Sequence, residues 1–131
     1  NVVAGDFSLI HRDAEQAYLV HLVTGQDMGP TTVRAWLRVE YFDPPTADRR
    51  FRSVAALYDV DCAHPRLRYL AADMFAAQNR GGERVETRDE TSPRWSYPRP
   101  RQFEERLVQS VCAARARRLA LEGPLWIPAE P

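Results

Sequence analysis

Alternation of apolar and polar positions dominates the chain from the N-terminus to about residue 88. It is clearest in Thr31–Phe42, where every second residue from Val33 to Tyr41 is apolar. A period of two is typical of a strand that is buried on one face only. Weaker versions of the pattern predict further strands at Phe7–His11, Tyr18–Thr24, Ser53–Asp61, Arg66–Phe75 and Glu83–Arg88. The chain is therefore expected to form about six antiparallel strands, joined by turns and loops at Gly25–Pro30, Asp43–Arg50, Cys62–Pro65 and Asn79–Gly82.

Charge predicts the register of the hairpin formed by Ser53–Asp61 and Arg66–Phe75. The short connection would place Asp61 opposite Arg66 and Asp59 opposite Arg68. The other face of the hairpin would then carry the apolar set Ala56, Tyr58, Val60, Leu67, Tyr69 and Ala71. Because each carboxylate faces an arginine, we interpret Asp59 and Asp61 as ion-pair partners rather than as half of a calcium site.

The hydrophobic period becomes helical in the last third of the chain. A helix is predicted from Arg101 to about Leu121, with an apolar stripe formed by Phe103, Leu107, Val108, Val111, Cys112 and Leu119. Acidic residues lie in its first turns and Arg115, Arg117 and Arg118 lie near its expected end, which suits the helix dipole. Gly123 and Pro124 are expected to end the helix, and residues 124–131 would form an arm that packs through Trp126 or frays.

Composition fits one folded domain and excludes some partners. The 131 residues and 15.0 kDa suit a single α+β domain spanning 1–131, with one antiparallel sheet and the helix packed on one face. The 18 basic residues, all arginine, balance 18 acidic ones, which argues against nucleic acid or an anionic bilayer as partner. No apolar run is long enough to span a membrane. The chain starts without methionine, as expected of an exported protein that has lost its signal segment or of a trimmed fragment.

No pattern of residues predicts catalysis, a metal site or a cofactor. The sequence contains no G-x-S-x-G, P-loop, G-x-G-x-x-G or H-E-x-x-H motif. The histidines His11, His21 and His64 do not have the spacing of metal ligands on one strand or helix face. We therefore expect no catalytic residue, no metal and no cofactor.

The two cysteines, Cys62 and Cys112, lie at the end of a predicted strand and on the apolar stripe of the predicted helix. Neither belongs to a C-x-x-C pair, so a redox motif or a zinc half-site has no support. A disulfide between them is the favoured interpretation. Two free buried thiols are the alternative.

Aromatic residues beside arginines mark a candidate binding face. Arg34, Trp36 and Arg38 share the polar face of their predicted strand, and Phe42 follows at its end. Tryptophan and arginine together are typical of protein-binding hot spots. The alternative is that this face packs under the loop Asp43–Arg50 or under the C-terminal arm. Base stacking in the manner of strand-surface RNA binders is disfavoured by the pI of about 7.0.

Several segments, taken in order, resemble the surface-adhesin protein E family. They are Val33-Arg34-Ala35-Trp36, Ser53-Val54, Leu57 to Cys62, Arg66-Leu67-Arg68, Trp95-Ser96 and Val111-Cys112 at the helix. The resemblance implies an antiparallel sheet with a C-terminal helix on one face and a disulfide that joins strand to helix. It also implies export to the envelope or surface of a Gram-negative bacterium and a role as an adhesin for host extracellular proteins.

The sequence thus predicts a non-catalytic, exported module that binds a protein partner from the host or the envelope. The expected location is the periplasm, the outer membrane or the cell surface. The main alternative is a structural or self-associating envelope component, for example a homodimer, without a host ligand. A small enzyme is the third hypothesis.

Overall fold

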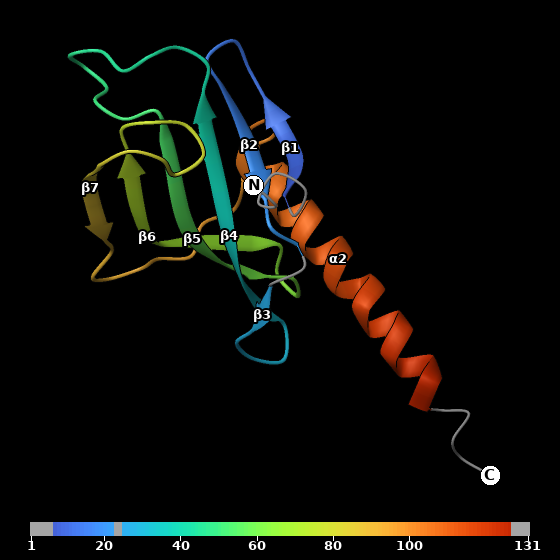
Figure 1. Ribbon diagram of the computed structural model, residues 1–131. Helices are drawn as coiled ribbons and strands as arrows, with labels where there is room; N and C mark the ends of the chain where they lie inside the picture. Colours follow the sequence, from blue (N-terminus) through green and yellow to red (C-terminus); the bar gives the residue numbers. More distant parts are fainter. Residues whose placement is uncertain (1–6, 23–24, 127–131) are drawn as a thin grey trace.

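The computed structural model describes residues 7–22 and 25–126, which form one sheet and one long helix (Figure 1). The strands are β1 (Ser8–Arg12), β2 (Gln16–Val20), β3 (Gln26–Asp27), β4 (Thr32–Tyr41), β5 (Ser53–Asp61), β6 (Arg66–Phe75) and β7 (Arg84–Asp89). The helix α2 spans Phe103–Trp126. The strand order is β1-β2-β4-β5-β6-β7, all antiparallel, and β3 adds to β4 beyond the end of β2. The predicted fold class is confirmed.

Strand prediction was most accurate at the centre of the sheet. The bounds of β5 and β6 are those that the apolar alternation predicts. The strand expected at Tyr18–Thr24 instead starts at Gln16 and ends at Val20, and residues 23–24 of that prediction lie outside the described residues. The sequence did not predict β3, because two polar residues carry no alternation to detect.

The β5–β6 register confirms the pairing expected from charge. Asp61 lies opposite Arg66, Asp59 opposite Arg68, and Tyr58 opposite Tyr69. Beyond Tyr58 the prediction is wrong by one residue, because the register shifts between Leu57 and Tyr58 and Ala56 faces Ala72 instead of Ala71. An extra residue in one strand is a β-bulge, and uniform alternation does not predict it.

The hydrophobic core lies between α2 and one face of the sheet. It is built from apolar positions of β1, β2, β4, β5 and β6 together with the helix stripe. Its fully or nearly fully buried members include Val20, Val33, Leu37, Val60, Leu67, Leu107 and Val111. At the start of α2 the ring of Phe103 stacks on Tyr18, with centroids 4.5 Å apart. The predicted stripe is confirmed as far as Cys112, but Leu119 is 45% exposed because the helix extends away from the sheet there (Figure 1).

The helix starts and ends later than the sequence predicted. Arg101 has a φ of 68° and donates its main-chain N–H to the Glu105 carboxylate, which defines the start at Phe103. At the other end the helix continues through Gly123 and Pro124 to Trp126, so the arm expected at 124–131 overlaps its last residues. Glycine and proline lower helix propensity without forbidding helical backbone near an end. The remaining residues of that arm, 127–131, lie outside the described residues.

The later end of the helix also changes the role of its arginines. Arg115 and Arg118 lie mid-helix, so they do not serve the helix dipole as expected. Arg118 forms an ion pair with Asp27 of β3 at 2.8 Å, and Arg115 donates to the carbonyl of Pro30 at 2.6 Å. These contacts hold the middle of α2 against the β3 hairpin.

The expected disulfide joins Cys62, after β5, to Cys112 on α2. Its Cα atoms are 5.6 Å apart and the sequence separation is 50 residues. The bond links the sheet to the helix at the core interface, so the alternative of two free thiols is not supported.

Candidate binding face of the sheet

The face of the sheet opposite α2, here called the open face, carries the predicted binding residues of β4. Val33, Ala35 and Leu37 point into the core, so Arg34, Trp36 and Arg38 point to the open face. Trp36 is 42% exposed although it lies in the middle of a central strand. Its cross-strand neighbour on β5 is Leu57, which is partly buried. Neither the loop at 43–50 nor any other described segment buries the indole.

Arg38 shares this face but is not available to a partner. It is only 4% exposed, and its Nη1 donates to Asn79 Oδ1 at 2.6 Å and to Glu40 Oε2 at 3.4 Å. The Phe7 ring lies over its guanidinium, 4.6 Å from centroid to Cζ. Burial lowers the pKa of Arg38 below its ordinary value. Arg38 therefore supports the turn that contains Asn79. The alternation of the strand predicted an exposed side chain at this position instead.

Phe42 lies at the end of the open face, directly after β4. It is 37% exposed, and the guanidinium of Arg12 lies 5.2 Å from its ring centroid. Within the loop at 43–50, Arg49 stacks on Tyr41 at 4.2 Å and donates to the carbonyl of Phe51. Of the predicted residues, the structure thus leaves Trp36, Phe42 and part of Arg34 accessible.

A buried carboxylate anchors Arg34 to the neighbouring strands. Asp59 is 0% exposed and lies opposite Arg34 on β4 and opposite Arg68 on β6. Arg34 donates from Nε to Oδ1 at 2.9 Å and from Nη2 to Oδ2 at 3.2 Å, while Arg68 donates from Nε to Oδ2 at 3.1 Å. A buried charge is tolerated only when it is paired in this way. The sequence predicted the Arg68 pair, but the Arg34 pair requires the β4–β5 register, which could not be deduced from the hairpin alone.

Asp61, the second buried carboxylate of β5, accepts hydrogen bonds from other groups as well as from its arginine partner. It accepts hydrogen bonds from Arg66 Nε at 2.9 Å, from Thr31 Oγ1 at 3.0 Å and from the Ala63 N–H at 3.0 Å. Burial alone would raise the pKa of Asp61, but these hydrogen bonds outweigh it and lower the pKa to about 2. The side chain is thus ionised across the physiological range.

This lowered pKa predicts an acid-sensitive contribution to stability. Asp61 stabilises the fold fully above its unfolded pKa of about 3.9, and the contribution is lost as the pH falls toward about 2. We expect the free energy of unfolding to fall by about 2 kcal/mol over that interval because of this group. Urea titrations of the native protein and of Asp61→Asn between neutral pH and acid would measure it. If both proteins lost equal stability over the interval, the prediction would be wrong.

Trp95 extends the open face at the β6 edge, and the sequence did not identify it as part of a site. The segment after β7 returns to β6 through reciprocal hydrogen bonds between Ser96 and Leu67, at 2.9 Å each. Trp95 thereby lies against β6, where the guanidinium groups of Arg66 and Arg68 are 4.6 Å and 4.4 Å from its ring centroid. A cation over an indole ring is a favourable pair. Only the tertiary path of the chain after β7 reveals this contact.

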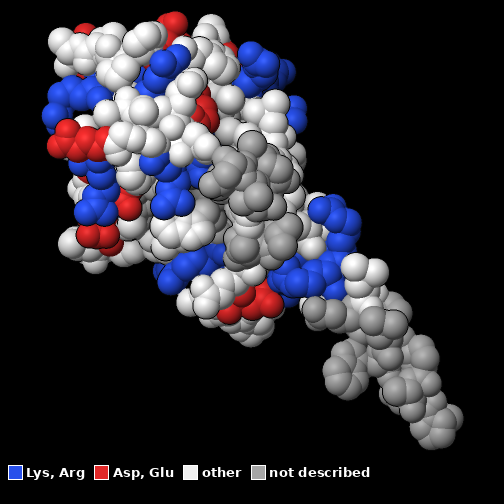
Figure 2. All heavy atoms as spheres, viewed as in Figure 1, with Lys and Arg blue, Asp and Glu red and all other residues white. Residues whose placement is uncertain are grey.

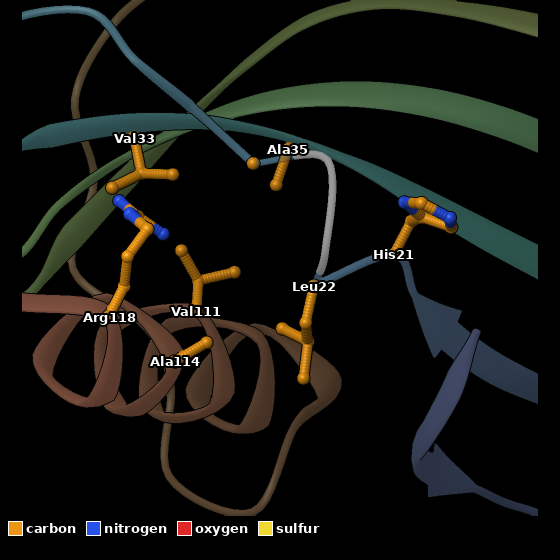
Figure 3. A pocket seen from close by; sticks show the side chains of 8 residues that line it. His21, Leu22, Val33, Ala35, Val111, Ala114 and Arg118 are labelled. Atoms are coloured by element: carbon orange, nitrogen blue, oxygen red, sulfur yellow. The ribbon is translucent and has the colours of Figure 1, made fainter. Parts of the chain in front are cut away.

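The interface between the sheet and α2 offers little room for a ligand. A cavity of about 10 Å³ lies between the sheet and the helix, where Leu22, Val33, Ala35, Val111 and Arg118 are among its lining residues (Figure 3). That volume is about the size of a single water molecule. Within residues 7–22 and 25–126 no helix is long and apolar enough to cross a membrane.

Comparisons with known proteins agree with this fold. The family model described as Surface-adhesin protein E matches residues 7–113. A solved structure of Haemophilus influenzae protein E has a TM-score of 0.58 at 16% identity, covering 82% of this chain and 84% of that one. A second crystal form of that protein has a TM-score of 0.59 at 15% identity, covering 82% of this chain and 87% of that one. Protein E from non-typeable Haemophilus influenzae gives 0.58 at 16%, with 82% and 76% covered.

Among curated proteins, no sequence matches this chain. At these identities the solved structures support the fold alone, and the family model carries the assignment. That model covers all the strands, the disulfide and the first half of α2. The chain therefore belongs to the surface-adhesin protein E family.

Proposed function

We propose that this protein is a non-catalytic binding module of the cell envelope or surface, which engages a protein partner through its open face. Membership in a surface-adhesin family implies an extracytoplasmic location. The observation that carries the proposal is the exposure of Trp36 in the middle of a central strand. The Cys62–Cys112 disulfide also suits an oxidising compartment outside the cytoplasm.

The surroundings of Trp36 favour a protein as partner. Arg34 lies two residues away on the same face and is held by Asp59, so little side-chain entropy is lost when it binds. Phe42 adds a second exposed ring at the end of β4. A rigid indole beside an anchored arginine is the composition that protein-binding hot spots favour.

Replacing Trp36 with alanine tests the proposal. We expect Trp36→Ala to weaken partner binding or self-association by about 2 kcal/mol, because the indole supplies apolar contact area, and to leave the fold largely intact. Binding would be measured by biolayer interferometry against purified extracellular matrix and envelope proteins, and self-association by sedimentation. Leu121→Ala is the matched control, since Leu121 is 71% exposed on the helix, away from the open face.

The thermal stability of the same variants identifies the opposite case. A large loss of stability in Trp36→Ala with unchanged association would show that the indole is structural and would contradict the proposal. A loss confined to self-association would favour the structural, self-associating hypothesis instead.

A further inference from the structure

Around β5 the charges of the open face are arranged in depth, with two aspartates below and three arginines above them. We use the name arginine cluster for Arg34, Arg66 and Arg68, whose side chains are 32%, 30% and 32% exposed. Their carboxylate partners Asp59 and Asp61 are only 0% and 4% exposed. Solvent, or a partner, therefore meets guanidinium groups and not the acids that balance them.

Each guanidinium of the arginine cluster keeps hydrogen-bond donors for a ligand. Arg66 donates to Asp61 from Nε, and among the described residues no group accepts from its terminal nitrogens. Arg34 donates to Asp59 from Nε and Nη2, and Arg68 donates from Nε, with its Nη2 in ion-pair contact with the same carboxylate. Because a guanidinium has five N–H donors, several remain on every member.

The tryptophans flank and order these donors. Trp95 lies against both Arg66 and Arg68, at 4.6 Å and 4.4 Å, so the two cations share one platform. Arg34 is linked to Arg68 through Asp59, which lies between them, and Trp36 lies two residues after Arg34 on β4. The result is a preorganised set of donors with apolar rings beside it.

We propose that the partner binds this face through an acidic segment, whose carboxylates accept from the arginine cluster while its apolar side chains contact Trp36. This inference rests on the proposed function. A planar guanidinium fork matches a carboxylate, and arginines already held in place recognise it at low entropic cost.

A protein segment fits better than a highly charged polymer. The three arginines are offset by two aspartates beneath them, and the chain as a whole has a net charge of +0. Figure 2 shows acidic side chains between the basic ones on the visible face rather than one continuous basic surface. Nucleic acid and sulfated polysaccharide are bound through extended positive charge, which this face lacks.

A synthetic peptide pair tests the inference. The acidic probe is a capped twelve-residue peptide that alternates Glu and Asp with Leu and Tyr, and the neutral probe replaces each acid by its amide. We expect the acidic probe to shift the indole N–H signals of Trp36 and Trp95 in NMR spectra and to bind at least about tenfold more tightly than the neutral one. Its affinity should fall as salt is raised.

Variants locate the site. Arg66→Gln should weaken the acidic probe about tenfold, whereas Arg117→Gln, at an exposed arginine of α2, should not change its affinity. Arg66→Gln is expected to lower stability, because Asp61 loses its ion pair, but the protein should still fold because Asp61 keeps its hydrogen bonds from Thr31 and Ala63. Arg66→Lys keeps the charge but loses the planar fork, so its affinity for the acidic probe should lie between those of the native protein and Arg66→Gln.

The outcomes separate this inference from the function on which it rests. Equal binding of both peptides, no response at millimolar concentration, or tighter binding of a heparin oligosaccharide than of the acidic probe would each overturn the acidic-segment inference. The proposed function fails separately, if Trp36→Ala leaves binding to every protein unchanged.

Discussion

Removing the Cys62–Cys112 disulfide is expected to cost about 4 kcal/mol of unfolding free energy. The bond closes a loop with a sequence separation of 50 residues that contains β6 and β7. In the chain-entropy model, opening such a loop increases the conformational entropy of the unfolded chain, which lowers the free energy of unfolding by this amount. The measurement is urea unfolding of the Cys62→Ala/Cys112→Ala double variant against the native protein, both without reductant.

Thiol chemistry provides the control. Reducing the native protein should lower its stability nearly to that of the double variant, and reductant should leave the double variant unchanged. Intact mass after alkylation under non-reducing denaturation should show no free thiol. Two alkylated cysteines, or unfolding that does not respond to reductant, would contradict both the bond and the oxidising location that it supports.

The fold was largely predictable because its signals are local. Alternation over ten residues of β4 and the complementary charges of Asp59 and Asp61 against Arg68 and Arg66 determine strands and register between neighbours. The bulge in the β5–β6 pair and the two-residue β3 depend on the way strands twist and meet, and no local pattern encodes them. The end of α2 was predicted too early for a related reason: Gly123 and Pro124 lower helix propensity, but they do not by themselves end a helix.

The candidate site was predictable only in part, because burial depends on distant segments. Trp36 was identified from its aromatic character on a polar strand face, and the structure leaves it 42% exposed. Arg38 occupies an equivalent position two residues later, yet Phe7 and Asn79 enclose it. Trp95 joins the site from a segment whose path no periodicity specifies. Alternation assigns a residue to a face, but the loops that cover that face determine what a partner can reach.

Packing between helix and sheet leads to the second large prediction. Leu107 is 0% exposed and belongs to the core cluster between α2 and the sheet, while Arg106 beside it is exposed. Leu107→Ala is expected to destabilise the protein by about 2 to 5 kcal/mol, because it removes buried methyl groups and leaves a cavity. Arg106→Ala should change stability by less than about 0.5 kcal/mol.

Urea unfolding of both variants under oxidising conditions makes this comparison a test of the architecture. The intact disulfide keeps α2 attached to the sheet at Cys112, so a difference between the variants reports on the packing of the stripe and not on detachment of the helix. Leu107 lies one turn after Phe103 and one turn before Val111, so it is the central member of the row that faces the sheet. If the two substitutions had equal effects, α2 would not pack on the sheet through this row, and the assignment of the opposite face as open to a partner would lose its basis.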